Sequence, residues 1–154
     1  MAKPMVTRTA LVTGGNRGIG FEVYLLEVAE DTLLEALAVN FLGPLHLSRA
    51  LVPPMLRAGN ITSGYGSFSS GLAGPAPYSL SKAALNALTL RLSSEVKGDV
   101  AVNAVDPGWV KTRMGGRAAP RSVEQGADTI VWLATHPSPA PNGSLFRNRR
   151  VVPW

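Results

Sequence analysis

A glycine-rich turn directly after an apolar segment is the feature that most restricts the fold. Residues 7–13 are typical of a short buried strand, and Gly14, Gly18 and Gly20 follow before a helical pattern begins near Phe21. Glycines at this spacing let the backbone turn tightly and approach a pyrophosphate, which the N-terminus of the next helix favours. The spacing differs from the Gly-x-Gly-x-x-Gly of most dinucleotide sites, so an ordinary strand-to-helix turn is the alternative.

Strands and helices alternate along the rest of the chain. Further strands are expected at residues 59–63 and 100–105, and a last one near the C-terminus. Helices are expected at residues 31–55, 79–97 and 122–134. This alternation predicts an α/β layered sheet, in one domain that spans residues 1–154.

The expected helices carry recognisable ends. Asp31 precedes an apolar helical pattern and is expected to be the N-cap of the first long helix, which Gly43-Pro44 should bend. Gly98 is expected to end the second helix. Ser122 with Gln125 three residues later predicts a capping box at the start of the third.

Composition and charge narrow the classes of function. The chain has no cysteine, which rules out disulfides and thiolate metal sites and fits the cytoplasmic location that we expect. Its start does not resemble a signal peptide, and no apolar run reaches the ~20 residues of a membrane span. The net charge is +5, but a nucleic-acid binder usually has a denser basic stripe with interleaved aromatic residues. We therefore expect neither a membrane nor a nucleic-acid partner.

Tyr78 and Lys82 form the most informative pair of polar side chains. Four residues apart on a helix, they lie on the same face. A phenol with a pKa near ~10 exchanges protons poorly at neutral pH unless a neighbouring ammonium stabilises the phenolate. The alternative is a surface tyrosine and lysine that meet by chance.

Two further polar positions follow expected strands. Ser63 ends a short strand before the loop 64–77, where its hydroxyl can bind a substrate carbonyl or simply form a turn. Pro107-Gly108 ends the strand 100–105, with Thr112 four residues after Gly108. In open α/β sheets this end of the strands is where ligands bind.

These motifs resemble the short-chain dehydrogenase/reductase family, and they occur in that family's order. They are the segment 13–20, Asn40, Ser63, Tyr78-x-x-x-Lys82 and Asp106-Pro107-Gly108. The residues around them, 81–88 and 102–110, and the ending 146–154 are similar to carbonyl-reductase-type members. The resemblance covers nearly the whole chain and implies a Rossmann-like, doubly wound parallel sheet, here reduced by an internal deletion.

The resemblance also implies an NADP-dependent oxidoreductase that acts on a small-molecule carbonyl or alcohol. Tyr78 would protonate the carbonyl oxygen as hydride arrives from the nicotinamide, and Ser63 would hold that carbonyl. Lys82 would lower the pKa of Tyr78 and hold the nicotinamide ribose, while Asn40 would hold a water that links Lys82 to solvent.

Cofactor contacts are implied in the same way. Arg17 resembles the basic residue that favours the 2′-phosphate of NADP over NAD, because a guanidinium matches phosphate geometry. Thr112 would help to hold the nicotinamide end. The implied cofactor-binding residues are Gly14, Asn16, Arg17, Gly18, Ile19, Gly20, Tyr78, Lys82, Pro107, Gly108, Val110 and Thr112.

The interval between Gly20 and Asn40 is too short for this fold. In the family it holds two further strand–helix units and another strand, so roughly 60 to 90 residues are absent. The residue that contacts the adenosine ribose and an Asn-Asn-Ala-Gly turn are lost with them. If inner strands are missing, apolar faces and strand edges become exposed. The strand before Ser63 also looks shortened, because residues 57–60 offer little extended chain.

Three interpretations follow from this deletion. The chain is an NADP-dependent carbonyl reductase, or an inactive form of one. Alternatively it is a non-catalytic remnant that acts through its helices, because in the family the helices bearing Asn40 and Tyr78 often build a homodimer interface. The third interpretation is an unstable product of a deleted gene copy or a mis-assembled reading frame.

Overall fold

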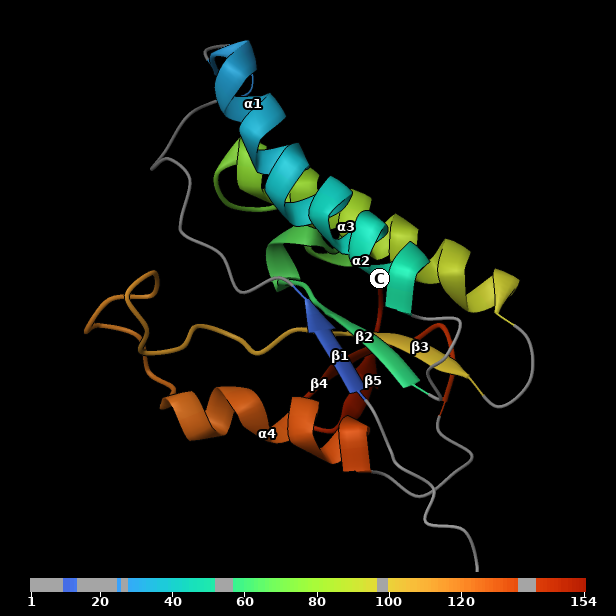
Figure 1. The fold of residues 1–154 in the computed structure, drawn as a ribbon. Coiled ribbons are helices and arrows are strands. Elements are labelled where there is room, and N and C mark those ends of the chain that lie inside the picture. Colours follow the sequence, from blue (N-terminus) through green and yellow to red (C-terminus); the bar gives the residue numbers. More distant parts are fainter. Residues whose placement is uncertain (1–9, 14–24, 26–27, 52–56, 97–99, 136–140) are drawn as a thin grey trace, which may run out of the picture.

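A mostly parallel sheet with helices on both sides forms the fold (Figure 1). The computed structural model describes residues 10–13, 25, 28–51, 57–96, 100–135 and 141–154, and within these ranges five strands form one sheet. The strands are β1 (Ala10–Thr13), β2 (Arg57–Ile61), β3 (Ala101–Val105), β4 (Leu145–Arg147) and β5 (Arg150–Val152). They lie in chain order; β1 to β4 are parallel neighbours and β5 runs antiparallel to β4. The predicted parallel α/β sheet is therefore confirmed, including a last strand near the C-terminus.

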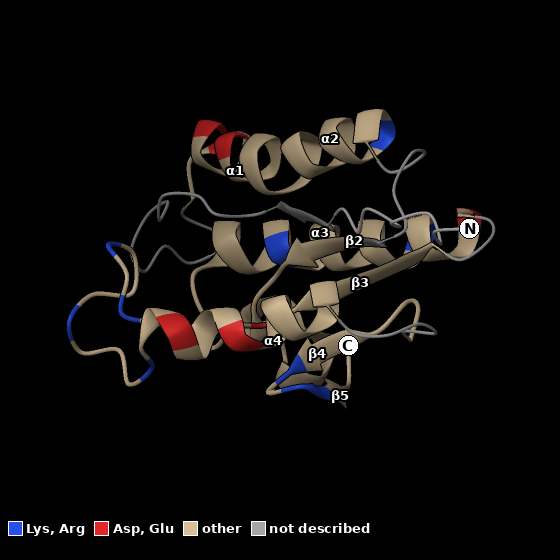
Figure 2. Ribbon diagram, turned by 60° about the horizontal axis from the view of Figure 1, so that its bottom comes forward, with Lys and Arg blue, Asp and Glu red and all other residues tan. Residues whose placement is uncertain are grey.

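The helices are divided between the two faces of this sheet. On one face, α3 (Ala76–Glu95) packs on β2 and β3, and α1 (Glu30–Leu37) packs on α3. The π-helical segment η1 (Ala38–Leu42) and α2 (Gly43–Leu51) continue α1 as one rod. On the other side lies α4 (Val123–Thr135), as Figures 1 and 2 show. Helices on both faces are what a doubly wound sheet requires.

The centre of the sheet is fully buried, as expected of parallel strands. All five residues of β3 are buried. Ala58 of β2 and Val102 of β3 form the core under α3, and the partly buried Leu92, Val96 and Val100 pack against them. This packing fixes α3 above the middle of the sheet.

The strand order shows which part of the fold the deletion removes. β1 pairs directly with β2, from Ala10 opposite Arg57 to Thr13 opposite Asn60. In the doubly wound order 3-2-1-4-5-6, the second and third strands lie beyond the first. Of the three strands that the chain lacks, two therefore belong to the flank beyond β1, and the third belongs between β1 and β2. Because β1 pairs directly with β2, the expected loss of an inner strand is closed by a new pairing. Residues 57–60, which looked too short for a strand, form most of β2.

The first helix begins earlier than the sequence predicts. Its N-cap is Ala29, which makes no side-chain cap, and Asp31 lies inside the first turn. The prediction of Asp31 as N-cap is therefore wrong, although a carboxylate in the first turn is still favourable to the helix dipole.

The rod continues through Gly43-Pro44 by widening its turns. In η1 the backbone N–H of Gly43 donates to the carbonyl of Ala38, five residues earlier. Pro44 has no N–H, and its ring would clash with the carbonyl of Asn40 in a regular α-helix. We attribute the π-helical segment to this clash, since such segments let a helix absorb a local mismatch without ending.

Other expected boundaries are shifted by a few residues. Helix α3 starts at Ala76, so Tyr78 is in its first turn, and it ends at Glu95; Gly98 and residues 7–9 lie outside the described residues. Ser63 follows β2 instead of ending it, and the loop 64–77 contains the short helices η2 (Gly64–Gly66) and η3 (Phe68–Ser70).

The predicted capping box of α4 is confirmed. The Ser122 hydroxyl accepts from the backbone N–H of Gln125 at 3.2 Å, and the Gln125 side chain accepts from the N–H of Ser122 at 2.9 Å.

We predict that Gly66→Ala destabilises the fold. A Cβ at Gly66 would lie 2.6 Å from the carbonyl carbon of Lys82, where the loop touches the backbone of α3. Overpacking of this kind costs about 1–3 kcal/mol in the free energy of unfolding, measurable by urea denaturation. As a control, a Cβ at Gly43 in α2 would meet its nearest atom at 3.6 Å, so Gly43→Ala should be neutral or stabilise by up to about 1 kcal/mol. Equal effects of the two substitutions would contradict the described packing.

Candidate active site

The candidate site lies at the carboxyl ends of β2 and β3. Because these strands are parallel, the loops that follow them leave the sheet at the same edge. The N–H of Thr62 donates to the carbonyl of Val105 at 2.9 Å, which holds the two strand ends together. The first turn of α3 brings Tyr78 to this edge.

Ser63 has the turn-forming role that the sequence allowed, and it also contacts Tyr78. Its hydroxyl accepts from the N–H of Tyr65 at 3.2 Å and so caps η2, which makes it a turn residue. It also makes a side-chain hydrogen bond with Tyr78. The ring of Tyr65 meets the ring of Tyr78 edge-on, with their centroids 6.4 Å apart. The Tyr78 phenol is thus bounded by one hydroxyl and one aromatic ring.

Lys82 is a buried cation without a carboxylate partner in the described residues. Only 2% of the residue is exposed, and the ion pairs that the structure describes do not include it. Its Nζ donates to the carbonyl of Ile61 at 2.8 Å and lies 5.7 Å from the centroid of the Tyr78 ring. Loss of hydration on burial lowers the pKa of Lys82 to about 8.

The pKa of Tyr78 is raised above its ordinary value. Burial is the main cause; the hydrogen bond with Ser63 opposes it, and the charges of Asp106 and Tyr65 add to it. The phenol is itself desolvated, and a buried group resists taking on charge. Lys82 is not among the causes of the shift, so the expectation that it lowers the pKa of Tyr78 stays a prediction.

Asn40 reaches the site through Ser81, which precedes Lys82. The Asn40 side-chain amide donates to the Ser81 hydroxyl at 3.1 Å, and that hydroxyl donates to the carbonyl of Tyr78 at 2.8 Å. Asn40 and Ser81 are both buried. This connection ties η1 to the first turn of α3, and a water held by Asn40 stays a prediction.

The loop after β2 is held on α3 by three residues that had no predicted role: Thr62, Gly66 and Asn86. Asn86 donates to the carbonyl of Gly66 at 2.8 Å, and it accepts a hydrogen bond from the hydroxyl of Thr62. Asn86 and Thr62 are each 2% exposed. The spacing of Tyr78, Lys82 and Asn86, four residues apart on one helix, was a signal that could have identified Asn86.

The segment after β3 is a tight turn beside the site. Gly108 has φ +74°, and its N–H donates to the Asp106 carboxylate at 2.9 Å. Val110 packs against α4 at Gly126, where a Cβ would lie 2.6 Å from it. The exposed Thr112 hydroxyl accepts from the N–H of Gly115 at 3.0 Å, and so shapes its own turn.

The structure thus brings together part of the predicted site. Asn40, Ser63, Tyr78, Lys82 and the turn of Pro107 and Gly108 lie around one edge of the sheet. The glycine-loop residues Gly14, Asn16, Arg17, Gly18, Ile19 and Gly20 lie outside the described residues.

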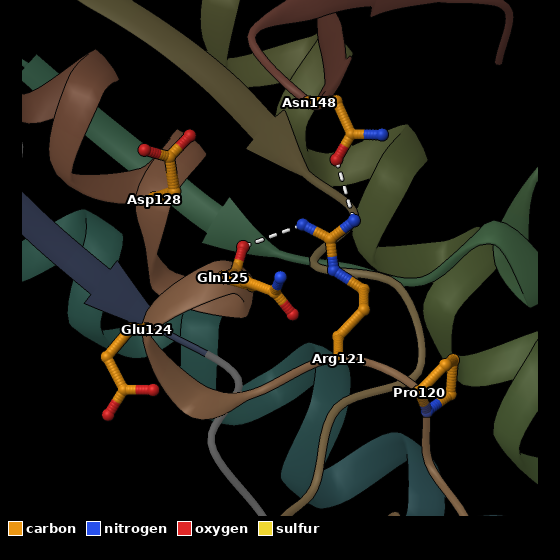
Figure 3. A pocket seen from close by; sticks show the side chains of 6 residues that line it. All are labelled: Pro120, Arg121, Glu124, Gln125, Asp128 and Asn148. Carbon is orange, nitrogen blue, oxygen red and sulfur yellow. Dashed lines mark hydrogen bonds between the residues drawn. The ribbon is translucent and has the colours of Figure 1, made fainter.

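A separate surface hollow lies beside α4 (Figure 3). Its lining residues are Pro120, Arg121, Glu124, Gln125, Asp128 and Asn148. The Arg121 guanidinium donates to the side chain of Asn148 at 2.7 Å and to the carbonyl of Gln125 at 2.6 Å. Arg121 therefore links the β4–β5 turn to α4. None of the predicted site residues lines the hollow.

The described residues contain neither a cluster of metal ligands nor a membrane-spanning helix. They hold no group of three or more histidine or acidic side chains that could bind a metal ion. No described helix is both long and apolar enough to cross a membrane.

Comparisons with known proteins give the relatives of this chain. The family model "short chain dehydrogenase" matches residues 23–123. Carbonyl reductase [NADPH] 1 of Bos taurus is 48% identical over 67 residues, which are 42% of this chain and 24% of that protein. The Homo sapiens protein of the same name is 45% identical, with the same coverage. The matched segment is thus about a quarter of the length of these relatives.

Solved structures match over most of the chain. The carbonyl reductase Sniffer of D. melanogaster has a TM-score of 0.84 at 26% identity, covering 94% of this chain and 66% of that one. An NADPH-bound carbonyl reductase from chicken fatty liver has a TM-score of 0.75 at 27% identity, covering 90% of this chain and 61% of that one. The chain therefore has the family's fold, with about a third of it missing.

We predict that Lys82→Met stabilises the protein at neutral pH. An unfolded lysine has a pKa near ~10.4, so lowering it to about 8 costs the folded state up to ~3 kcal/mol below pH 8. The cost is relieved as the pH rises from about 8 towards ~10.4, because the folded state then loses its proton first. Methionine fills similar space without charge, so Lys82→Met should be about 1–3 kcal/mol more stable at pH ~7 and less so at pH ~9.5.

Urea denaturation at both pH values measures this difference. The control is the exposed Lys111, where Lys111→Met should change stability by less than about 0.5 kcal/mol at either pH. A Lys82→Met protein that is less stable at neutral pH would show that the hydrogen bond to Ile61 outweighs the cost of burial.

Proposed function

The chain belongs to the short-chain dehydrogenase family, and we propose that it is an NADPH-dependent reductase of small carbonyl compounds. The observation that carries the proposal is the cluster at the sheet edge. The phenol of Tyr78 is hydrogen-bonded to Ser63 and lies beside the buried ammonium of Lys82. The relatives whose names include carbonyl reductase and NADPH support the same activity.

Lys82 has the chemistry needed to hold the nicotinamide ribose. An ammonium has three N–H donors, and the structure describes one acceptor for them, the carbonyl of Ile61. The remaining donors suit sugar hydroxyls. We propose that Lys82, with the turn of Pro107 and Gly108, Val110 and Thr112, holds this end of NADP. Gly14, Asn16, Arg17, Gly18, Ile19 and Gly20 would hold the phosphates, and Arg17 would favour NADP over NAD. When bound, NADPH supplies the hydride.

Tyr78 is suited to give a proton to a carbonyl oxygen. With its pKa raised by burial, the phenol keeps its proton at neutral pH. Ser63, hydrogen-bonded to the same phenol, can donate to the substrate oxygen that Tyr78 protonates. As the alcohol forms, Tyr78 passes its proton to that oxygen, and the nearby Lys82 stabilises the negative charge left on the phenolate. The half of the family's site that contacts adenosine is not encoded, so we propose weak cofactor binding.

Substitution of Tyr78 tests this role. Tyr78→Phe should lower kcat for NADPH-dependent reduction of a panel of ketones and aldehydes by about 10²–10⁴-fold, and leave the Kd for NADPH within a few-fold. Tyr65→Phe is the matched control: it removes a neighbouring hydroxyl, and it should lower kcat by less than about tenfold. Absorbance of NADPH follows turnover, and its fluorescence follows binding. If the wild-type chain binds no NADPH at millimolar concentration, the proposed activity is wrong for this chain.

A second candidate function is helix-mediated dimerisation. Four leucines on the rod are exposed, at positions Leu34, Leu42, Leu47 and Leu51. Exposed leucines repeated along one rod suit an interaction surface, and we propose a homodimer through the helices bearing Asn40 and Tyr78. Sedimentation would decide: a monomer at all concentrations counts against the homodimer.

We also propose that residues 1–154 fold as one domain and, from the absence of cysteine, that the protein is cytoplasmic.

A further inference from the structure

A nearly buried carboxylate lies directly behind the candidate site. Asp106 follows β3, and only 6% of its side chain is exposed. One carboxylate oxygen accepts from the N–H of Gly108 at 2.9 Å, and the other lies 3.4 Å from Nη1 of Arg147. A buried carboxylate is costly unless it is paired and hydrogen-bonded. In the described residues, Arg147 is the cation that forms an ion pair with it.

Arg147 reaches Asp106 from the end of the next strand, β4. Its guanidinium lies over two glycines, since a Cβ at Gly64 would be 4.0 Å from Nη1 and a Cβ at Gly108 3.6 Å from Nη2. Gly64 follows Ser63, and Gly108 belongs to the turn after β3. The ion pair therefore joins the loops after β2 and β3 to the end of β4.

The charge of Asp106 is felt at the Tyr78 phenol, where it raises the pKa. The polar and charged groups that face this phenol are few. Lys82 comes from the same helix, Ser63 and Tyr65 from the loop after β2, and Asp106 from the end of β3. Arg147 meets this set only through Asp106. Removal of the guanidinium would leave the carboxylate charge uncompensated beside the phenol.

We propose that Arg147 is a positioning residue for Tyr78: by pairing with Asp106, it holds the two loops of the site together and partly offsets the negative charge that the carboxylate presents to the phenol. The proposal rests on the proposed function only in naming Tyr78 as the proton donor. The effect of the Asp106–Arg147 pair on the ionisation of Tyr78 can be measured without cofactor or substrate.

The test is a pH titration of Tyr78 by fluorine NMR. The full chain is labelled with 3-fluorotyrosine, whose more acidic phenol ionises at lower pH than tyrosine, and Tyr78→Phe assigns the signal. Arg147→Gln should raise the titration midpoint of residue 78 by about half a pH unit or more, because an opposite charge is lost from its surroundings. Arg147→Lys should restore most of the wild-type midpoint. Circular dichroism at each pH checks that the chain stays folded.

Two further variants separate charge from structure. Arg150→Gln removes the same charge from the residue opposite Arg147 in the hairpin, and should move the midpoint by less than about 0.2 units. Asp106→Asn combined with Arg147→Gln should return the midpoint to the wild-type value or below. The proposal is overturned if Arg147→Gln and Arg150→Gln shift the midpoint equally, or if the double variant keeps the raised midpoint. Lack of turnover with NADPH would defeat the proposed function and leave this titration unaffected.

Discussion

The contact between α3 and the end of β2 determines the geometry of the whole site. Gly66 touches the backbone of α3 at Lys82, and the Lys82 ammonium donates to the carbonyl of Ile61. Asn86, one turn further along, fixes the same loop. Together these contacts set how far α3 is rotated and shifted above the sheet, and thereby place Tyr78 against Ser63. The fold accepts a buried cation at this point, which is costly in stability and therefore indicates a function for the ammonium.

The sheet explains how a fold can lose a third of its length and keep this contact. The missing strands follow β1 in the chain; in a doubly wound sheet two of them lie beyond β1, and the third lies between β1 and β2. The direct pair β1–β2 closes the gap left by that inner strand, while β2–β3 and β3–β4 remain parallel neighbours. All the contacts among Ser63, Tyr78, Lys82 and Asp106 lie within β2, β3, α3 and their loops. The loss therefore falls outside these contacts, and the cluster that we propose to handle the proton is retained.

Much of this could be predicted from local patterns in the sequence. The alternation of strands and helices, the capping box at Ser122 and the shared helix face of Tyr78 and Lys82 depend on residues a few positions apart. What could not be predicted depends on tertiary packing. Burial raises the pKa of Tyr78, and the pairing of Asp106 with Arg147 joins residues 41 positions apart. The π-helical segment at Asn40 was missed because Pro44 was expected to bend the helix, whereas the chain widened its turns instead.

We propose that the retained half of the site still directs hydride transfer. The most direct measurement uses NADPH carrying deuterium at the transferable position of the nicotinamide, incubated with the chain and an aromatic ketone. Mass spectrometry of the product detects even a few turnovers, so slow catalysis by weakly bound cofactor is not missed. The account predicts an alcohol with deuterium on its carbinol carbon, formed by the wild-type chain and not by Tyr78→Phe. An absence of labelled alcohol with the wild-type chain, or equal labelling with both, would contradict it.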